Sequence, residues 1–338
     1  MGACSPGLRG PGGNPTADPC VSCEMGTPNI ALTTSARPRM SKLRRNEAIA
    51  GLAFVLPWII SLLVFTAYPV LASLYYSFTE YAITQSPKWV GLENYTAMFT
   101  TDTAFPTGVY NSAYYALLSV PLGLASSLAL AVLLNVRVRF IGLYRTLYYL
   151  ASLTPPVAGT LIFLVMFQPR GGLINVVLGF FGVHGPEWFA DPNWAKPGLI
   201  LLSLWGVGAS TLIFLAGLKD IPAELLEAAS IDGANAWQRF WRITIPLLTP
   251  VILYNLVTGV IGSFQVFTSA IVIGGTTGKP QESLLMYFVH LYREAFRYFN
   301  MGYASALAVV LFIVILVITV LIFRTTKGWV FYEGEQKS

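Results

Sequence analysis

The sequence predicts an all-α integral membrane protein with six transmembrane helices, and three observations lead to this fold class. Hydrophobic residues make up 55% of the 338 residues and charged residues only 11%, whereas soluble domains carry about a quarter charged residues. Six stretches contain no charged residue, and each has room for the roughly 20 residues that cross a bilayer. These stretches are 48–79, 103–136, 146–169, 197–218, 243–278 and 298–323.

The third observation is the placement of the basic residues. Fifteen of the 21 Lys and Arg residues lie in the two tails and in the connections on their side of the predicted membrane, and six lie on the other side. Since cytoplasmic loops are enriched in Lys and Arg, both termini are expected in the cytoplasm. The net charge of +5 therefore reflects membrane topology, and we expect no nucleic-acid partner. The six outer residues are Lys88, Arg170, Lys196, Lys279, Arg293 and Arg297.

The first 45 residues are expected to be a disordered basic tail, residues 46–327 the membrane domain, and residues 328–338 a cytoplasmic C-terminal tail. The tail up to about residue 36 is rich in Gly, Pro, Ser and Thr and has too little apolar surface to fold. All three cysteines, Cys4, Cys20 and Cys23, lie in it. A single Cys-x-x-Cys pair is weak evidence for zinc, so no metal site is expected.

The first three spans follow in order. The first, about 49–70, contains Pro57 and Pro69, and the external segment 80–107 after it should carry a short surface helix at 94–99. The second runs from about 109 to 134. The third, 146–167, contains Thr154-Pro155-Pro156, whose freed backbone carbonyls need a neighbouring helix or a water-filled cavity. A pathway lining and a packing kink are both open readings of these prolines.

Polar residues within the fourth and fifth spans are candidates for a substrate pathway. Before them, residues 168–196 are expected to form a compact irregular loop in which His184 is a surface residue. Polar amides inside a span need an interior partner, and aromatic rings beside hydrogen-bonding groups suit sugar rings. Close helix packing explains the small and hydroxyl residues equally well. The candidates are Ser203, Gly206, Ser210, Asn255, Ser263, Phe264, Gln265 and Phe267.

The last external segment, 282–300, places Arg293 and Arg297 four residues apart on a predicted helix that also carries His290. A helix facing solvent or headgroups is the ordinary interpretation, and an acidic partner surface is the alternative. Span six, 301–323, is nearly all aliphatic and is expected to face lipid.

A charged island between spans four and five, residues 219–246, is predicted to form two short helices at a membrane face. Residues 223–231 make the first helix, Gly233 can take a positive φ at the corner, and residues 234–243 make the second. Pro222 suits a first helical turn and Pro246 marks the start of the next span.

The island resembles the cytoplasmic loop of permease subunits in binding-protein-dependent ABC importers. That family's pattern is Glu-Ala-Ala, three residues, Gly, nine residues, then Ile-x-Leu-Pro, and this chain departs from it only by Ile245 in place of Leu. An ordinary amphipathic loop helix is the alternative. The residues that match, or lie within, the pattern are Glu227, Ala228, Ala229, Asp232, Gly233, Ile243 and Pro246.

Further segments are similar to the carbohydrate-uptake branch of these importers, of the maltose, glycerol-3-phosphate and trehalose type. They are the Pro57-Trp58 to Phe78 stretch, Gly91-Leu92-Glu93-Asn94-Tyr95, and the run from Gly262 to Phe267 with the glycines after it. The resemblance covers the chain from about residue 48 and points to the first permease of a pair. The usual Thr-x-Gly-Gly-Pro ending is lengthened and altered here, which leaves that loop's geometry undefined.

The resemblance implies a six-span, type I importer-like fold, in which the loop 219–246 is a coupling helix that docks on an ATPase and Glu227 is its main polar contact. It implies a second permease subunit, two ATP-binding subunits that hold ATP and Mg, and an extracytoplasmic substrate-binding protein. The expected location is a bacterial or archaeal cell (inner) membrane. The expected cargo is a sugar or a related polyol or sugar phosphate.

Other classes fit the sequence less well. The chain has no Gly-x-x-x-x-Gly-Lys-Ser/Thr phosphate loop, so ATP hydrolysis is expected in a partner chain. No catalytic set of nucleophile, base and orienting group is evident, and we expect no enzyme. A secondary carrier usually keeps a charged residue near the membrane midplane, and the six stretches have none. A secondary carrier or a channel subunit remains the alternative function.

Overall fold

A computed structural model describes residues 42–136 and 139–326. The chain divides into two units, residues 1–59 and residues 60–338, which we describe separately. The described part of the first unit belongs to helix α1 (Lys42–Leu62), which contains Pro57. Of the tail 1–45 that was expected to be disordered, residues 1–41 lie outside the described residues, and residues 42–45 are helical because α1 already begins at Lys42. The C-terminal tail 328–338 also lies outside the described residues.

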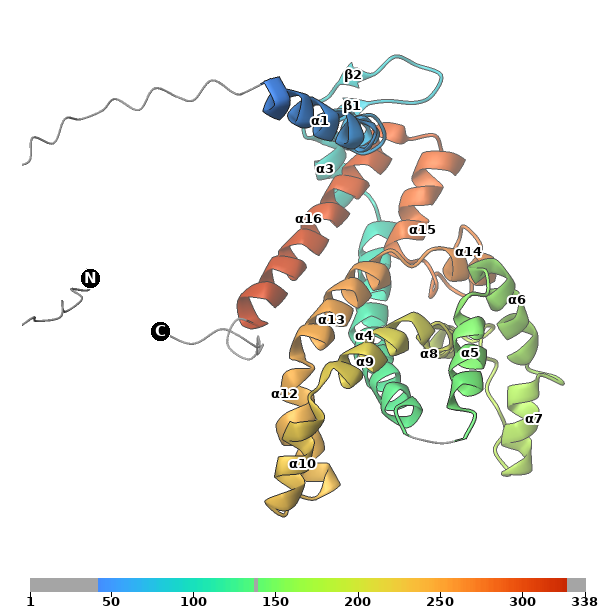
Figure 1. Ribbon diagram of the computed structural model, residues 1–338. Helices are drawn as coiled ribbons and strands as arrows, with labels where there is room; N and C mark the ends of the chain where they lie inside the picture. Colours follow the sequence, from blue (N-terminus) through green and yellow to red (C-terminus); the bar gives the residue numbers. More distant parts are fainter. Residues whose placement is uncertain (1–41, 137–138, 327–338) are drawn as a thin grey trace, which may run out of the picture. The chain divides into compact units, whose positions relative to one another are not determined.

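The second unit is helical apart from one short hairpin (Figure 1). Its first half contains η1 (Leu63–Ala67), α2 (Tyr68–Tyr76), β1 (Thr79–Glu80), β2 (Lys88–Trp89), α3 (Glu93–Thr100), α4 (Ala104–Leu134), α5 (Ile141–Ser152), α6 (Pro156–Met166) and α7 (Leu173–Phe180), where η marks a π-helix. Its second half contains α8 (Pro192–Trp205), α9 (Gly208–Asp220), α10 (Ala223–Ile231), α11 (Ala236–Arg239), η2 (Phe240–Thr244), α12 (Ile245–Leu247), α13 (Thr249–Phe264), α14 (Thr268–Gly274), α15 (Tyr287–Tyr292), η3 (Arg293–Arg297) and α16 (Met301–Thr326).

Four helical stretches are long and apolar enough to cross a membrane: Ile49–Tyr76, Ala104–Leu134, Thr249–Gly274 and Met301–Thr326. Two further spans are bent pairs, α5 with α6 and α8 with α9. Counting each pair as one gives the six spans that the charge-free stretches predict, within the described residues. The pattern of apolar stretches therefore located every span but could not show where the helices break.

The third span, expected over 146–167, is broken into α5 and α6, which are bent by 95° relative to one another. Pro155 and Pro156 lack the N–H groups that would continue α5, and Pro156 instead begins α6. The fourth span is bent by 49° at Gly206 and Val207. The fifth has a smaller interruption, because α13 ends at Phe264 and α14 begins at Thr268.

The region 168–196 is more ordered than the expected irregular loop. It contains α7, and α8 already begins at Pro192. Asp191 caps α8, its side chain accepting a hydrogen bond from the Asn193 amide at 2.9 Å, and Pro192 takes the first helical position, where no N–H is needed. His184 is exposed, as expected.

Helix α4 is central to the second unit and contacts α8, α9, α13 and α15 (Figure 1). A buried cluster fixes its C-terminal part, where Ala131 packs with residues of α9 and with Leu248. Close approach also joins α5 to α9, because a Cβ on Gly208 would lie 2.7 Å from the Ser152 Cβ. Helix α16 contacts α2, α3 and α13, so it is packed against helices on part of its surface and does not face lipid alone.

Candidate functional site: a polar cavity and a helical loop

The loop between α9 and α13 forms two short helices with a sharp corner, as predicted. Helix α10 spans Ala223–Ile231, and Gly233 has a φ of +81° in the left-handed region that glycine adopts at least cost. Pro222 lies one position earlier than expected, because it is the residue before α10 and not within its first turn. Helix α11 is shorter than the expected 234–243 helix, and a π-helical turn completes that stretch.

Local hydrogen bonds stabilise the second half of this loop. Asn235 and Gln238 form a capping box. The backbone N–H of Gln238 donates to Asn235 Oδ1 at 2.8 Å, and the backbone N–H of Asn235 donates to Gln238 Oε1 at 2.9 Å. Arg239 Nη1 donates to the Leu226 carbonyl at 3.5 Å and so joins the second helix to the first. The corner is therefore built by contacts within about twenty residues.

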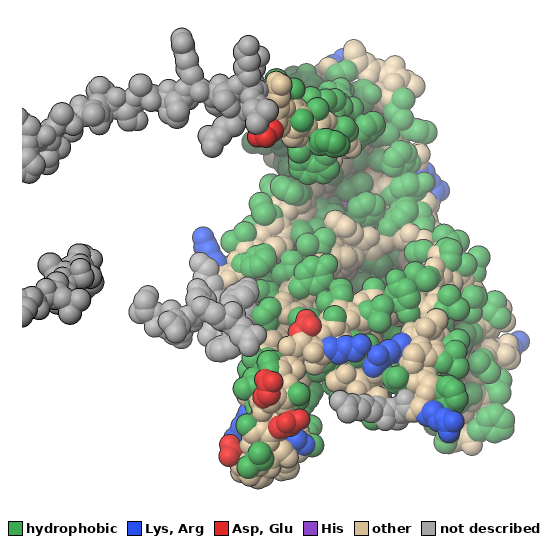
Figure 2. Space-filling model, in the orientation of Figure 1, with side chains coloured by type: hydrophobic (Ala, Val, Ile, Leu, Met, Phe, Trp, Pro, Cys, Tyr) green, Lys and Arg blue, Asp and Glu red, His purple; other side chains and the backbone are tan. Residues whose placement is uncertain are grey.

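The structure exposes the polar face of α10. Glu227, Ala228, Asp232 and Gly233 are exposed, while Ala229, Ile243 and Pro246 are partly buried. Charged side chains gather at this end of the second unit, in contrast to the apolar surface along the spans (Figure 2). An exposed acidic side chain on a fixed helix is available to another protein surface.

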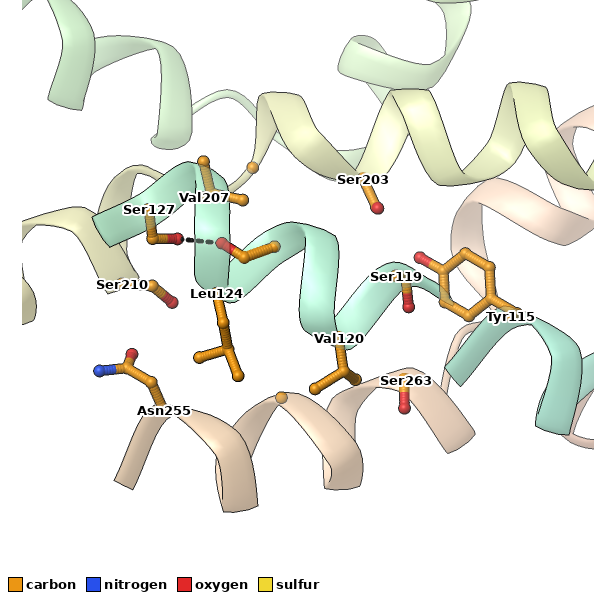
Figure 3. A pocket seen from close by; sticks show the side chains of 13 residues that line it. Tyr115, Ser119, Val120, Leu124, Ser127, Ser203, Val207, Ser210, Asn255 and Ser263 are labelled. Atoms are coloured by element: carbon orange, nitrogen blue, oxygen red, sulfur yellow. Dashed lines mark hydrogen bonds between the residues drawn. The ribbon is translucent and has the colours of Figure 1, made fainter. Parts of the chain in front are cut away.

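A cavity of about 210 Å³ lies along α4 where it faces α8, α9 and α13 (Figure 3). Five of the predicted pathway residues line it: Ser203, Gly206, Ser210, Asn255 and Ser263. They come from three helices and from the bend between α8 and α9, so the break in the fourth span places residues on both of its sides around one space.

The three remaining predicted pathway residues lie elsewhere. Phe264 packs in an apolar cluster with residues of α16. Phe267 contacts the rings of Phe288 and Tyr292, at centroid distances of 5.6 and 4.9 Å. Gln265 is the first residue after α13. These three positions belong to the interruption of the fifth span and do not line this cavity.

Sequence reasoning missed the contribution of α4. Tyr115, Ser119, Gly123 and Ser127 line the cavity together with Val120 and Leu124. A spacing of four residues places them on one face of a helix. That row of polar and small residues in the second span was a readable signal. Figure 3 shows Tyr115 and Ser203 pointing toward one another across the α4 and α8 sides.

Three of the five serines that line the cavity use their hydroxyl hydrogens within their own helices. Three serine hydroxyls donate to carbonyls of their own helices: Ser127 to Gly123 at 2.6 Å, Ser203 to Ile200 at 2.6 Å and Ser263 to Val260 at 2.8 Å. Each oxygen keeps lone pairs that can accept. Asn255 is 3% exposed, and its Nδ2 donates to the Val251 carbonyl at 2.9 Å.

The Oδ1 atom of Asn255 is a buried acceptor with no hydrogen-bond partner in the structure. Leaving such a group unpaired costs about 1–3 kcal/mol. None of the residues that line the cavity is charged. The cavity is therefore lined by uncharged hydroxyl groups and one amide, which suit a ligand that forms hydrogen bonds and carries no charge at that point.

A second polar group of residues is buried where α4, α15 and α16 meet. Asp102 Oδ1 accepts hydrogen bonds from the amides of Ala104 and Phe105 at 2.8 and 3.2 Å, at the start of α4. Its Oδ2 accepts from the Tyr303 hydroxyl at 2.5 Å and lies 2.7 Å from His290 Nε2. We call Asp102, His290, Arg293, Glu294 and Tyr303 the buried ionic cluster.

The bonding partners define the His290 tautomer. Arg293 Nη2 lies 3.1 Å from His290 Nδ1, and a guanidinium can only donate. Nδ1 therefore accepts, and Nε2 carries the hydrogen that is donated to Asp102. Since no nucleophile occupies the second ring nitrogen, this Asp–His pair is not a catalytic triad. Among the described residues, no group of three or more His, Cys, Asp or Glu side chains could hold a metal ion.

Burial by itself raises the pKa of the Asp102 carboxyl, but its hydrogen bond from Tyr303, the neighbouring His290 and the backbone N–H of Ala104 together outweigh it, so the pKa lies below its ordinary value.

The cluster also corrects the interpretation of 282–300 as a solvated helix. His290 is 1% and Arg293 9% exposed, and of the two arginines only Arg297 is exposed. Burial became favourable because Asp102, 188 residues from His290, supplies the partner.

Comparisons with known proteins agree with this architecture. Residues 119–326 match the family model described as "Binding-protein-dependent transport system inner membrane component". The "Probable ABC transporter permease protein YesP" of Bacillus subtilis (strain 168) is 43% identical over 312 residues, covering 90% of this chain and 100% of that protein. The "Arabinooligosaccharides transport system permease protein AraP" of the same organism is 33% identical over 293 residues, covering 86% and 91%.

Among solved structures, a bacterial alginate ABC transporter in complex with an alginate pentasaccharide-bound periplasmic protein contains a chain with the same fold. The TM-score is 0.73 at 23% identity, and the match covers 85% of this chain and 96% of that one. The matched family, the relatives and the fold lead to one conclusion: this chain belongs to the inner-membrane components of binding-protein-dependent transport systems and is a permease subunit of an ABC importer.

Proposed function

We propose that this permease carries a carbohydrate inward through the cavity along α4, driven by ATP that partner subunits hydrolyse. The observation that carries the proposal is the uncharged, hydroxyl-rich lining, with the unpaired Asn255 Oδ1 at its side. Carbohydrate hydroxyls donate hydrogen bonds and carry no charge, so they complement this lining. The relative named for arabinooligosaccharide transport, at 33% identity, supports the same class of cargo.

The size of the cavity indicates that this chain supplies part of a larger site. Ligand pockets usually have about 300–1,000 Å³, and this one has about 210 Å³. A second permease subunit, facing the same side of α4, would complete the passage. The binding protein expected for this family would deliver the cargo from the extracytoplasmic side.

The loop 219–246 is the proposed contact with the ATPase. Glu227 is exposed on α10, whose orientation is fixed by the Gly233 corner and by the Arg239 contact. Two ATP-binding subunits would hold ATP and Mg, and their closure would move this helix. The permease then shifts between inward-facing and outward-facing states, and each state must make contacts that the other lacks.

The topology follows from the basic residues. With the loop 219–246 in the cytoplasm, both termini are cytoplasmic and the α3, α7 and α15 segments lie outside, in a bacterial or archaeal cell membrane. The membrane domain is residues 46–327, preceded by a basic tail and followed by a short cytoplasmic tail.

Uptake into proteoliposomes that contain the complete transporter tests the proposal. Radiolabelled oligosaccharides should accumulate when ATP is inside and the binding protein is outside, and accumulation should stop without ATP. Replacing Asn255 by Leu, which removes the unpaired acceptor, should lower kcat/KM for uptake about tenfold.

Thr258→Val is the matched control, because Thr258 lies on the same helix but is exposed and outside the cavity. Equal effects of the Asn255 and Thr258 substitutions would show that the cavity is not part of the transport pathway. Flux that continues without ATP would contradict the importer function and support a channel or a secondary carrier.

A further inference from the structure

Lys196 is a half-buried cation near the start of α8. Its ammonium lies 4.8 Å from the ring centroid of Tyr110 and 5.2 Å from that of Tyr114, both on α4. Its Nζ donates a hydrogen bond to Asn111 Oδ1 at 3.0 Å. The side chain is thus held by three neighbouring residues of one helix.

Asn111 is itself fixed, which orients the lysine. Asn111 is 2% exposed, and its Nδ2 donates to the carbonyls of Glu282 and Leu285 at 2.8 and 3.0 Å. Because both amide hydrogens are used in this way, Oδ1 must face Lys196. The ammonium is therefore pre-organised by a buried amide that two distant backbone carbonyls hold in place.

This arrangement differs from a lysine that reaches for water or headgroups. Such a side chain extends away from the helix bundle with its charge in solvent. Lys196 turns instead toward a buried residue of α4. No carboxylate lies within 4.0 Å of its Nζ among the residues 42–136 and 139–326, and a cation at the edge of a membrane span is costly without an anionic partner.

Lys196 lies on the contact between α4 and α8, and residues further along the same two helices line the cavity. Ser203, which lines the cavity, follows Lys196 by seven residues on α8, and Tyr115 follows Asn111 by four on α4. These spacings correspond to about two turns and one turn of helix on one side of each helix. Lys196 therefore lies between the extracytoplasmic end of α8 and the cavity.

We propose that Lys196, Tyr110 and Tyr114 form a second subsite that binds the carboxylate of an acidic sugar, a uronate, as the saccharide approaches the cavity. This inference rests on the proposed carbohydrate function and specifies its cargo. The ammonium has three donors, of which Asn111 takes one, so at least one remains for a carboxylate oxygen. Tyr110 is 61% exposed and offers its ring to the apolar face of the sugar.

The charge count favours a carboxylate over a phosphate. A phosphate monoester carries about −1.5 to −2 at neutral pH, and Lys196 is one charge. The adjoining cavity has no charged side chain to neutralise a second. A singly charged uronate, whose other groups are neutral hydroxyls, matches both the lysine and the hydroxyl-rich cavity below it.

The experiment compares three pairs of disaccharides. In each pair one member contains galacturonate, glucuronate or mannuronate, and the other is the same disaccharide with its carboxyl groups reduced, so that it is neutral. Uptake is measured with the complete transporter in proteoliposomes. In the wild type at least one uronate should be imported. Lys196→Gln should lower the ratio of kcat/KM for the uronate to that for the neutral sugar about tenfold, and Lys196→Arg should restore most of that ratio.

Lys88→Gln removes an exposed lysine of the same predicted side and is the matched control. A purely structural role for Lys196, or a role in binding a lipid headgroup, would lower both uptakes in parallel and leave the ratio unchanged, which overturns the proposal. Import of the neutral members alone overturns it and leaves the carbohydrate function standing. Import of no member overturns the uronate proposal as well, and uptake of other oligosaccharides then decides whether the carbohydrate function stands.

Discussion

The loop 219–246 and the buried ionic cluster are both polar, but the chain builds them in opposite ways. The loop is exposed, and its helices, corner and capping box depend on contacts within about twenty residues. The cluster is buried and joins Asp102 to His290 and Tyr303, which are 188 and 201 residues away. The difference predicts that substitutions in the loop impair transport, whereas substitutions in the cluster impair folding.

The largest effect is expected for Glu227→Ala. Because Glu227 is exposed, the thermal unfolding midpoint in detergent should stay within about 1 °C, while a charged contact worth about 1.5–3 kcal/mol is lost at the ATPase. ATP-driven uptake should fall tenfold or more. Glu224→Ala removes another exposed acid of α10 and should have a much smaller effect. A lower midpoint for Glu227→Ala would erase the contrast between the two regions.

Asp102→Asn should produce the reverse pattern. The substitution keeps the shape but removes the charge that His290 faces and weakens the acceptor of the Tyr303 hydroxyl. Losing charged hydrogen bonds in this setting costs about 2 kcal/mol, so the unfolding midpoint should fall by several degrees. ATPase binding by the folded fraction should be unchanged. An unaltered midpoint would mean that the cluster does not hold α4 to α15 and α16.

The pH dependence of stability sharpens the assignment to Asp102. The pKa of this carboxyl in the folded protein lies below its ordinary value of 3.8, so the folded state binds its proton less readily than the unfolded state. Its contribution is therefore complete above about pH 4 and is lost as the pH falls through the lower, folded-state pKa. Wild-type midpoints should drop in this acid range more steeply than those of Asp102→Asn. Parallel curves would assign the acid sensitivity to other groups.

The smallest effect is expected for Gly233→Ala. A Cβ meets no neighbouring atom here, but the φ of +81° is unfavourable for alanine by about 1 kcal/mol. The corner should shift, and uptake should fall a few-fold with little change in global stability. Gly179→Ala is the control, since Gly179 also has free space but lies within α7. Equal uptake by both variants would show that the corner angle is not important for coupling.

The same contrast explains how much of the molecule the sequence could predict. Apolar stretches and charge placement gave the spans, and the turn chemistry around Gly233 gave the loop, because both signals are local. The 95° bend at Pro155 and Pro156 could not be predicted, because prolines show that a helix is interrupted but not by what angle. Burial of His290 and Arg293 could not be predicted, because their partner Asp102 lies in another segment.

The candidate cavity was predicted in part for a related reason. Ser203, Ser210, Asn255 and Ser263 were found as polar residues inside spans, and the four-residue spacing of the α4 row was a signal that was overlooked. The exclusion of Phe267 could not be predicted without knowing which helix faces meet. A polar residue within a span shows that an interior partner is needed. It does not show which partner supplies it.

The most direct test of the coupling loop is purification of tagged permease from detergent extract together with its partners. Wild type should recover a phosphate-loop ATPase and a second permease, and Glu227→Ala should recover the second permease with much less ATPase, while Asp102→Asn that remains folded should recover both. Recovery of the permease without an ATPase, or an ATPase yield unchanged by Glu227→Ala, would contradict the assignment of residues 219–246 as the coupling helix.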